Sequence, residues 1–185
     1  MRLTLSLFLA LATGFANAQG QDTDAAKALG FMRSMSIPLN AVQFFDRASE
    51  AWTWTFGKEP GAKLQLSDRE AGILEGTVRL NFRSTMLTGR EESMGSVIYH
   101  VRLQIRAGEC RAVVSGLSHT GNRTTTRGGI HLGTIMRNDT DVASAGGMSR
   151  SNLIRLHAEV RETATTRINS LLQAMEARIR ASVEP

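Results

Sequence analysis

Four side chains able to bind an anion occupy alternating positions of two predicted strands: Arg79, His100, Arg102 and Arg106. Side chains two residues apart in a strand point to the same face of a sheet. If the two strands are neighbours, these side chains share one surface, and the guanidinium fork suits phosphate and carboxylate groups. The pattern predicts a ligand-binding patch on an open sheet face. The competing interpretation is a charged face that discourages aggregation.

Residues for catalysis or metal binding form no recognisable pattern. The other histidines are His119, His131 and His157, and no pair in the chain has a typical ligand spacing. The stretch around Ser118 lacks the second glycine of a nucleophile elbow. We therefore predict no catalytic residue, no metal and no cofactor. The single cysteine, Cys110, rules out an internal disulfide, and we interpret it as a small buried hydrophobe.

Two tryptophans lie two positions apart in a predicted helix and so point to different faces. Trp52 shares a stripe with Phe45 and Phe56 and is expected in the core. For Trp54 we favour packing under the loop 57–63. The alternative is an exposed anchor for a partner or a sugar.

An alternation of apolar and polar residues predicts the strands that position these groups. They cover 31–37, 63–66, 73–83, 97–106 and 111–118, and the last four form an antiparallel meander. A helix is predicted between the first two strands. It is capped by Asn40 and Gln43, carries a stripe from Val42 to Phe56, and ends at Gly57.

The last third of the chain holds a loop and a long helix. Residues 119–148 are rich in Thr and Gly, and a structureless loop of this length is uncommon in a compact domain, so we expect it to be mobile or functional. The final helix is predicted at about 150–181. Its apolar stripe is Leu153, Leu156, Val160, Ala164, Ile168, Leu171, Met175 and Ile179.

The start of the chain has the layout of a secretory signal. Arg2 precedes an apolar run, and Ala16-Asn17-Ala18 provides a cleavage site after residue 18. We expect a signal peptide at 1–18, a flexible leader at 19–30 and a single domain at 31–185, in a periplasmic or secreted protein without a membrane span. The formal charge of +5 indicates attraction to anionic surfaces.

These elements give an α+β class with β-α-β-β-β-β-α order. The run from Leu64 to Gly76, with its D-x-E-A-G-x-L-x-G stretch, and the strand ending in Gly108-Glu109-Cys110-Arg111 resemble a bacterial exported domain of unknown function with a TATA-binding-protein-like fold. The resemblance covers about residues 31–118. It implies a fold and an export address, and no chemistry. No internal repeat builds the tandem saddle of minor-groove binding, so we expect no nucleic-acid partner.

The sequence thus predicts an exported, non-enzymatic binding domain that acts through the open sheet face or the final helix. Its partner would be an envelope protein, an anionic envelope component or a second copy of the chain. Two alternatives stay open. One is an envelope-directed hydrolase with converging carboxylates or a His–Ser pair beside 119–148. The other is a structural protein whose oligomer is lost when Leu171 and Met175 are made charged.

Overall fold

The computed structural model describes residues 27–87, 91–122, 124, 128–142, 144 and 148–181. The predicted signal peptide and most of the predicted leader lie outside these residues. The elements are β1 (Phe31–Ser36), α2 (Ala41–Trp54), the 3₁₀ helix η1 (Phe56–Lys58), β2 (Lys63–Asp68), β3 (Ile73–Phe82), η2 (Glu91–Ser93), β4 (Gly95–Arg106), β5 (Glu109–Gly121), β6 (Gly133–Thr134), η3 (Asp139–Asp141) and α3 (Arg150–Ala181).

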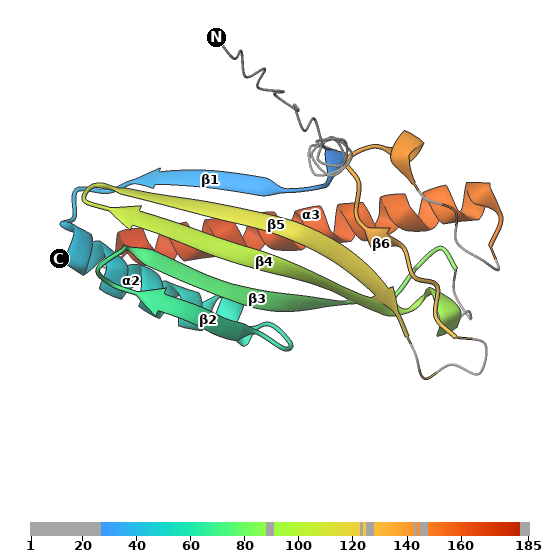
Figure 1. Ribbon diagram of the computed structural model, residues 1–185, viewed down its shortest axis with the longest axis horizontal. Coiled ribbons are helices and arrows are strands. Elements are labelled where there is room, and N and C mark those ends of the chain that lie inside the picture. Colours follow the sequence, from blue (N-terminus) through green and yellow to red (C-terminus); the bar gives the residue numbers. More distant parts are fainter. Residues whose placement is uncertain are drawn as a thin grey trace, which may run out of the picture.

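One antiparallel sheet forms the body of the molecule, in the order β1-β5-β4-β3-β2, with β6 paired to β5 (Figure 1). Both helices lie on the same face of this sheet, which we call the inner face; the other is the open face. The predicted α+β class, element order and four-strand meander are confirmed. The short strand β6 is an addition that the sequence pattern did not predict.

A β-bulge in β5 changes which residues face the helices. Ser115 lies opposite His100 and Ser118 opposite Ile98, so β5 holds one residue more than β4 between these pairs. Gly116 occupies the bulge with a φ of +67°, a conformation that favours glycine. Beyond it the inward positions are odd-numbered, and His119 becomes buried.

The predicted loop 119–148 contains more structure than expected. Strand β5 runs three residues past the predicted end at Ser118, and β6 pairs with it. The N–H of Ile135 donates to the carbonyl of Leu117 at 2.9 Å, and the Ile135 side chain is fully buried. A few apolar residues, Ile135 among them, thus hold the described part of this segment against the core.

Helix α2 begins where its cap predicts, because the side chain of Asn40 accepts a hydrogen bond from the N–H of Gln43. It ends at Trp54, three residues before the predicted end at Gly57, and Phe56 starts η1. The predicted stripe is partly wrong: Val42 is 53% exposed, while Phe44 is fully buried. Since α2 packs against both the sheet and α3, it buries a wider arc than one stripe.

Helix α3 matches its prediction closely. It spans roughly 48 Å at 1.5 Å per residue, and every residue of the predicted stripe is buried. The stripe packs on the sheet and α2 of the same chain, so charging Leu171 or Met175 would disrupt the core. Pairing of α3 with a second copy therefore requires its other face.

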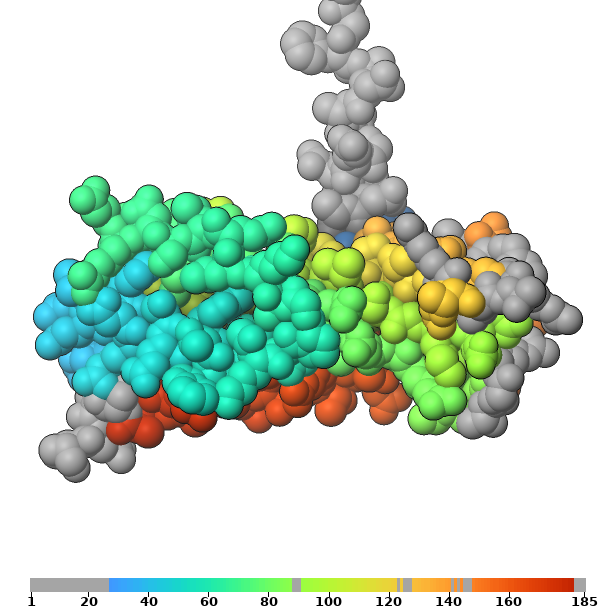
Figure 2. Space-filling view, turned by 90° about the horizontal axis from the view of Figure 1, so that it is seen from below, coloured from blue at the N-terminus to red at the C-terminus, as the bar shows by residue number. Residues whose placement is uncertain are grey.

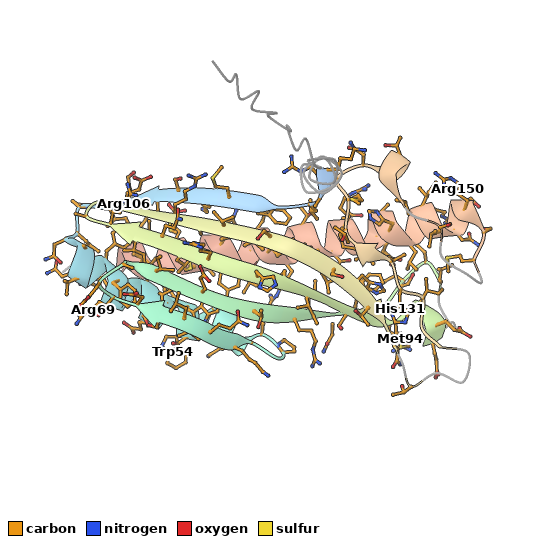
Figure 3. The ribbon with its side chains drawn as sticks, in the orientation of Figure 1. Trp54, Arg69, Met94, Arg106, His131 and Arg150 are labelled. Carbon is orange, nitrogen blue, oxygen red and sulfur yellow. The ribbon has the colours of Figure 1, made fainter. Side chains whose placement is uncertain are left out.

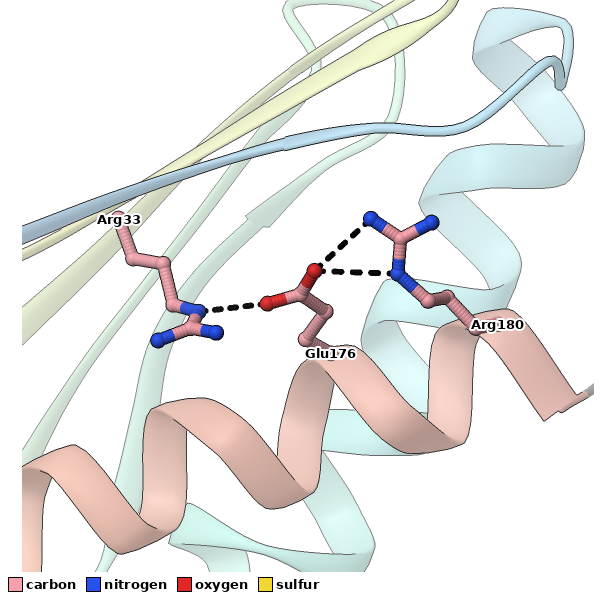
Figure 4. A network of polar contacts seen from close by, with 3 residues as sticks. All are labelled: Arg33, Glu176 and Arg180. Atoms are coloured by element: carbon pink, nitrogen blue, oxygen red, sulfur yellow. Dashed lines mark hydrogen bonds and ion pairs between the residues drawn. The ribbon is translucent and has the colours of Figure 1, made fainter.

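A polar network fixes the C-terminal part of α3 to the first strand (Figure 4). Arg33 on β1 donates from Nε to Glu176 at 2.6 Å, and Arg180 donates to the other carboxylate oxygen at 2.8 and 3.0 Å. The hydrogen bond from Arg180 lowers the pKa of Glu176, against the effect of burial, and Arg33 adds to this lowering.

Among the described residues no helix is long and apolar enough to cross a bilayer.

Candidate functional site

The open face carries the four side chains of the predicted patch in an extended row. His100, Arg102 and Arg106 lie along β4, and Arg79 lies on β3 opposite Ile98. Arg106 is eight residues beyond Ile98, which corresponds to roughly 26 Å along the strand. Figure 3 shows Arg106 at the far end of the sheet. The structure thus places all four on one face and does not bring them to one point.

Neighbouring acids balance part of this row. Arg102 forms an ion pair with Glu75 at 2.7 Å, and Arg106 is paired in register with Glu109. Arg106 lines a small cavity of about 140 Å³ together with Gln104, Glu109 and Arg111. Arg79, His100 and Arg102 are not part of its lining. Binding of an anion by the four residues together remains a prediction.

A groove between α2 and the end of α3 offers a more concentrated set of groups. It encloses about 280 Å³ and is lined by Arg47, Glu50, Ala51, Trp54, Arg178 and Ala181. We call it the Trp54 groove. Its tryptophan is 47% exposed, whereas Trp52 is 3% exposed, because residues two apart on a helix point in different directions.

Two cations hold the indole of Trp54 from different segments. The Nζ of Lys58 lies 4.2 Å from the ring centroid, and the guanidinium carbon of Arg178 lies 5.7 Å from it. Lys58 ends η1, and Arg178 is in the last turn of α3. The favoured expectation that the loop 57–63 covers Trp54 is therefore only partly right, since Lys58 lies over the ring and almost half of the Trp54 side chain stays exposed.

Sequence reasoning singled out Trp54 and missed its cationic neighbours. Arg47 lies seven residues, or about two turns, before Trp54 along α2, a spacing that is visible in the sequence. Arg178 is more than a hundred residues away, and no sequence signal places it there. Only the packing of α3 on α2 creates the groove.

Three histidines gather at the opposite end of the molecule, near β6. His119 and His157 are each 1% exposed, and His131 accepts a hydrogen bond from the N–H of Gly121 at 3.2 Å. Burial lowers the pKa of His119 to about 4, and the neighbouring His131 and His157 add to this. Among the described residues no group of three His, Cys, Asp or Glu side chains could hold a metal ion.

The groups considered for hydrolysis are placed apart. Ser118 and His119 are successive residues of β5, so their side chains point to opposite faces. Both ring nitrogens of His119 are buried and have no hydrogen-bond partner among the described residues. Cys110 is fully buried. Burial is the main cause that raises the pKa of its thiol to about 12, and the negative charge of the neighbouring Glu109 adds to it. This agrees with its interpretation as a packing residue.

Comparison with known proteins identifies the fold. No family model matches the chain. No curated protein matches it either. A TBP-like protein from Parabacteroides distasonis has a TM-score of 0.56 at 8% identity, with 80% of this chain and 93% of that chain covered. A DUF4468 family protein from Bacteroides ovatus has a TM-score of 0.50 at 15% identity, with 80% and 86% covered. The TBP-like fold and the similarity to bacterial domains of unknown function are thus confirmed.

Proposed function

We propose that the chain is an exported, non-enzymatic envelope-associated binding domain. Its binding surface is the Trp54 groove, at the exposed end of the long final helix. Its partner is an anionic envelope component. The proposal of export is supported by the signal-like residues 1–18 of the sequence. The observation that carries the binding proposal is the half-exposed Trp54 held between Lys58 and Arg178.

Tryptophan and arginine are the residues that most often dominate the energy of an interface. A cation over an indole face holds the ring in one orientation, so little rotamer freedom is lost when a partner covers it. Arg47, Lys58 and Arg178 outnumber the single acid of the groove, Glu50. The local charge therefore favours an acidic partner, in keeping with the basic balance of the whole chain.

The position of the groove suits docking of a large partner. It lies where α2 and α3 meet at one end of the molecule, away from the polar end that carries the histidines. The two helices are anchored to each other and to the sheet, so the groove residues stand on rigid elements. A bound surface or polymer would cover Trp54 without requiring the domain to open.

Export is tested by the N-terminus of the mature protein. The full chain is expressed in a Gram-negative host, and the periplasmic fraction is examined by intact mass. We expect a product that begins at Gln19. An unprocessed chain that stays in the cytoplasm would contradict the proposed export. It would not bear on the proposed binding surface, which the next experiment tests.

Binding is tested through the two tryptophans, because Trp54 is 47% exposed and should be quenched by iodide, whereas Trp52 is buried and should not. The probes are phosphatidylglycerol vesicles and poly-L-glutamate, with phosphatidylcholine vesicles as the neutral control. We expect the acidic probes to shift the emission and to protect Trp54 from iodide. The two acidic probes distinguish a lipid surface from an acidic polymer.

Charge reversal on α3 supplies a matched pair of variants. Arg178→Glu changes the groove, and Arg155→Glu makes the same charge change near the other end of the same helix. We expect Arg178→Glu and Trp54→Ala to weaken binding at least about tenfold, and Arg155→Glu to have a much smaller effect. Because Trp54→Ala lacks the fluorescent reporter, all variants are compared by co-sedimentation with the vesicles. Equal binding by all three variants would refute the Trp54 groove as the binding surface.

A further inference from the structure

The edge strand β2 leaves part of its neighbour uncovered. It pairs with β3 only from Ile73 to Thr77, although β3 continues to Phe82 (Figure 1). The N–H of Arg79 donates to the carbonyl of Pro60 at 3.2 Å, and this is the last backbone bond that the described residues make to this edge. Beyond Arg79, the edge of β3 that faces away from β4 has no paired strand among the described residues.

The backbone at Asn81 is the unpaired part of this edge. In β3 the even-numbered residues point their N–H and C=O toward β4, as Gly72 does just before the strand when its carbonyl accepts from the N–H of Ile105. Odd-numbered residues point outward, as the bond from Arg79 to Pro60 shows. Asn81 is exposed, and no described residue hydrogen-bonds its backbone on the outer edge. Within the described part of the chain, it therefore presents a donor and an acceptor that are not paired.

A groove runs along α3 beside this edge. It encloses about 490 Å³ and is lined by Leu80, Glu162, Thr163, Thr166, Arg167 and Ser170. In the view from below, the green residues of β3 and β4 lie directly beside the red helix α3 in the stretch that α2 and β2 do not cover (Figure 2). We call it the β3–α3 groove. Its volume is in the range of ligand sites.

Two anchors keep this groove rigid. Before β2, Glu59 is 8% exposed and binds Arg167 of α3, whose Nε donates to it at 3.2 Å. After β3, the hydroxyl of Ser84 donates to Glu159 of α3 at 2.5 Å. Helix and strand are thus tied together on both sides of the edge, so the unpaired backbone is held open in a fixed position.

The side chains around the edge define what would fit. On the inner side Leu80 is half-buried, and Thr163 and Thr166 line the groove on the side of α3. On the open face Arg79 and Arg83 are exposed on both sides of Asn81. A strand laid on this edge would alternate between the two sides. Apolar or hydroxyl side chains would suit the groove, and acidic side chains would suit the arginines.

We infer that the free edge of β3 and the β3–α3 groove together form a docking site for an extended peptide segment with this alternation. The peptide adds a short strand antiparallel or parallel to β3. Its main chain bonds to the outward N–H and C=O of Asn81, and its inward side chains pack against Leu80 and α3. A partner protein with an exposed acidic strand carries such a segment. The site is distinct from the Trp54 groove, since Arg178 lies eleven residues beyond Arg167 on α3, roughly 16 Å along the axis.

The test is selection of random nonapeptides displayed on phage against the immobilised domain, followed by titration of the enriched peptides in solution. Asn81→Pro removes the outward N–H and leaves every bond to β4 in place, and proline is tolerated at a strand edge. Asn81→Ala keeps the N–H and is the matched control. Thr166→Trp fills the groove from an exposed helix position. Circular dichroism and thermal melting show that each variant is folded.

We expect enriched peptides to alternate apolar and acidic residues. They should bind Asn81→Ala like the unmodified domain, and bind Asn81→Pro and Thr166→Trp at least about tenfold more weakly. Trp54→Ala should leave this binding unchanged. If Asn81→Pro does not fold, Thr166→Trp alone decides. Failure to enrich any peptide, or enriched peptides that bind all variants equally, would each overturn the inference.

Discussion

The half of the inner sheet face covered by α2 and the half beyond it are packed by different chemistry. Under α2 the buried residues are large and apolar, among them Phe44, Phe56 and Leu74, and Trp52 stacks on Phe56 with ring centroids 5.4 Å apart. Beyond α2 the buried set includes His119 and His157. Helix α2 fills its half with aromatic and aliphatic side chains, whereas the other half combines aliphatic side chains such as Leu117 and Ile135 with buried histidines.

The same difference appears in hydrogen bonding. Both nitrogens of His119, the Nδ1 of His157 and one Nη of Arg161 are buried without a partner among the described residues, and so is the hydroxyl of Tyr99 in the middle of β4. Such groups cost free energy when they are left unpaired. We conclude that the half under α2 supplies most of the stability and that the other half is the more easily perturbed one.

The largest expected effect is on the α2 half. Phe44→Ala removes a fully buried ring and should lower the free energy of unfolding by about 3–5 kcal/mol. Val42→Ala, on the same helix at a position 53% exposed, should change it by less than about 0.5 kcal/mol. Urea denaturation measures both. Similar values for the two variants would contradict the description of this half as the main core.

Acid should act on the other half. The pKa of His119 in the folded state is about 4, below the ordinary 6.5, so between these values the unfolded chain binds the proton more readily. The contribution of neutral His119 to the free energy of unfolding is complete above pH 6.5 and is lost as the pH falls toward 4. The loss is roughly 2–3 kcal/mol. The measurement is the urea midpoint at pH 7 and pH 4.5.

The variant His119→Leu isolates this contribution from that of the carboxylates. Its stability should fall less between pH 7 and pH 4.5 than that of the unmodified protein, and at pH 7 it should be no less stable, because an unpartnered polar group is replaced. Parallel pH profiles for the two proteins would show that the acid sensitivity resides elsewhere.

A smaller effect is expected where β1 is joined to α3. Glu176→Gln weakens the contacts to Arg33 and Arg180 and should cost about 1 kcal/mol at pH 7. Since the pKa of Glu176 is lowered in the folded state, its contribution is present above the ordinary carboxyl pKa and disappears as the pH falls through the folded value. Glu70→Gln is the control, at an exposed turn position. A Glu176→Gln variant as stable as the control would rule out this network as a stabilising feature.

Much of the fold follows from local pattern. The alternation in β3 and β4 and the stripe of α3 each involve one buried face, and the period of the sequence reveals a single face directly. Helix α2 is different because it contacts both the sheet and α3, so Phe44 is buried where a single stripe predicted Val42. At His119 the pattern fails for another reason, since the glycine bulge shifts the inward positions by one residue.

The candidate sites were harder to predict. A shared face does not fix position along a strand, so Arg79 and Arg106 share the open face and lie far apart. The cations around Trp54 come from η1 and from the last turn of α3, and only tertiary packing brings them together. The free edge at Asn81 results from the unequal lengths of β2 and β3, and strand ends are the least certain feature of a sequence-based prediction.

The pairing of β1 with β5 also affects how the chain folds. Ser36 lies opposite Glu109, so β1 cannot pair with β5 until more than seventy further residues have been synthesised. Pairings between distant segments slow folding. The meander from β2 to β5 can assemble from neighbouring segments, whereas β1 and the covering helix α3 must join afterwards. The chain therefore reaches its native state only after its last helix has been made.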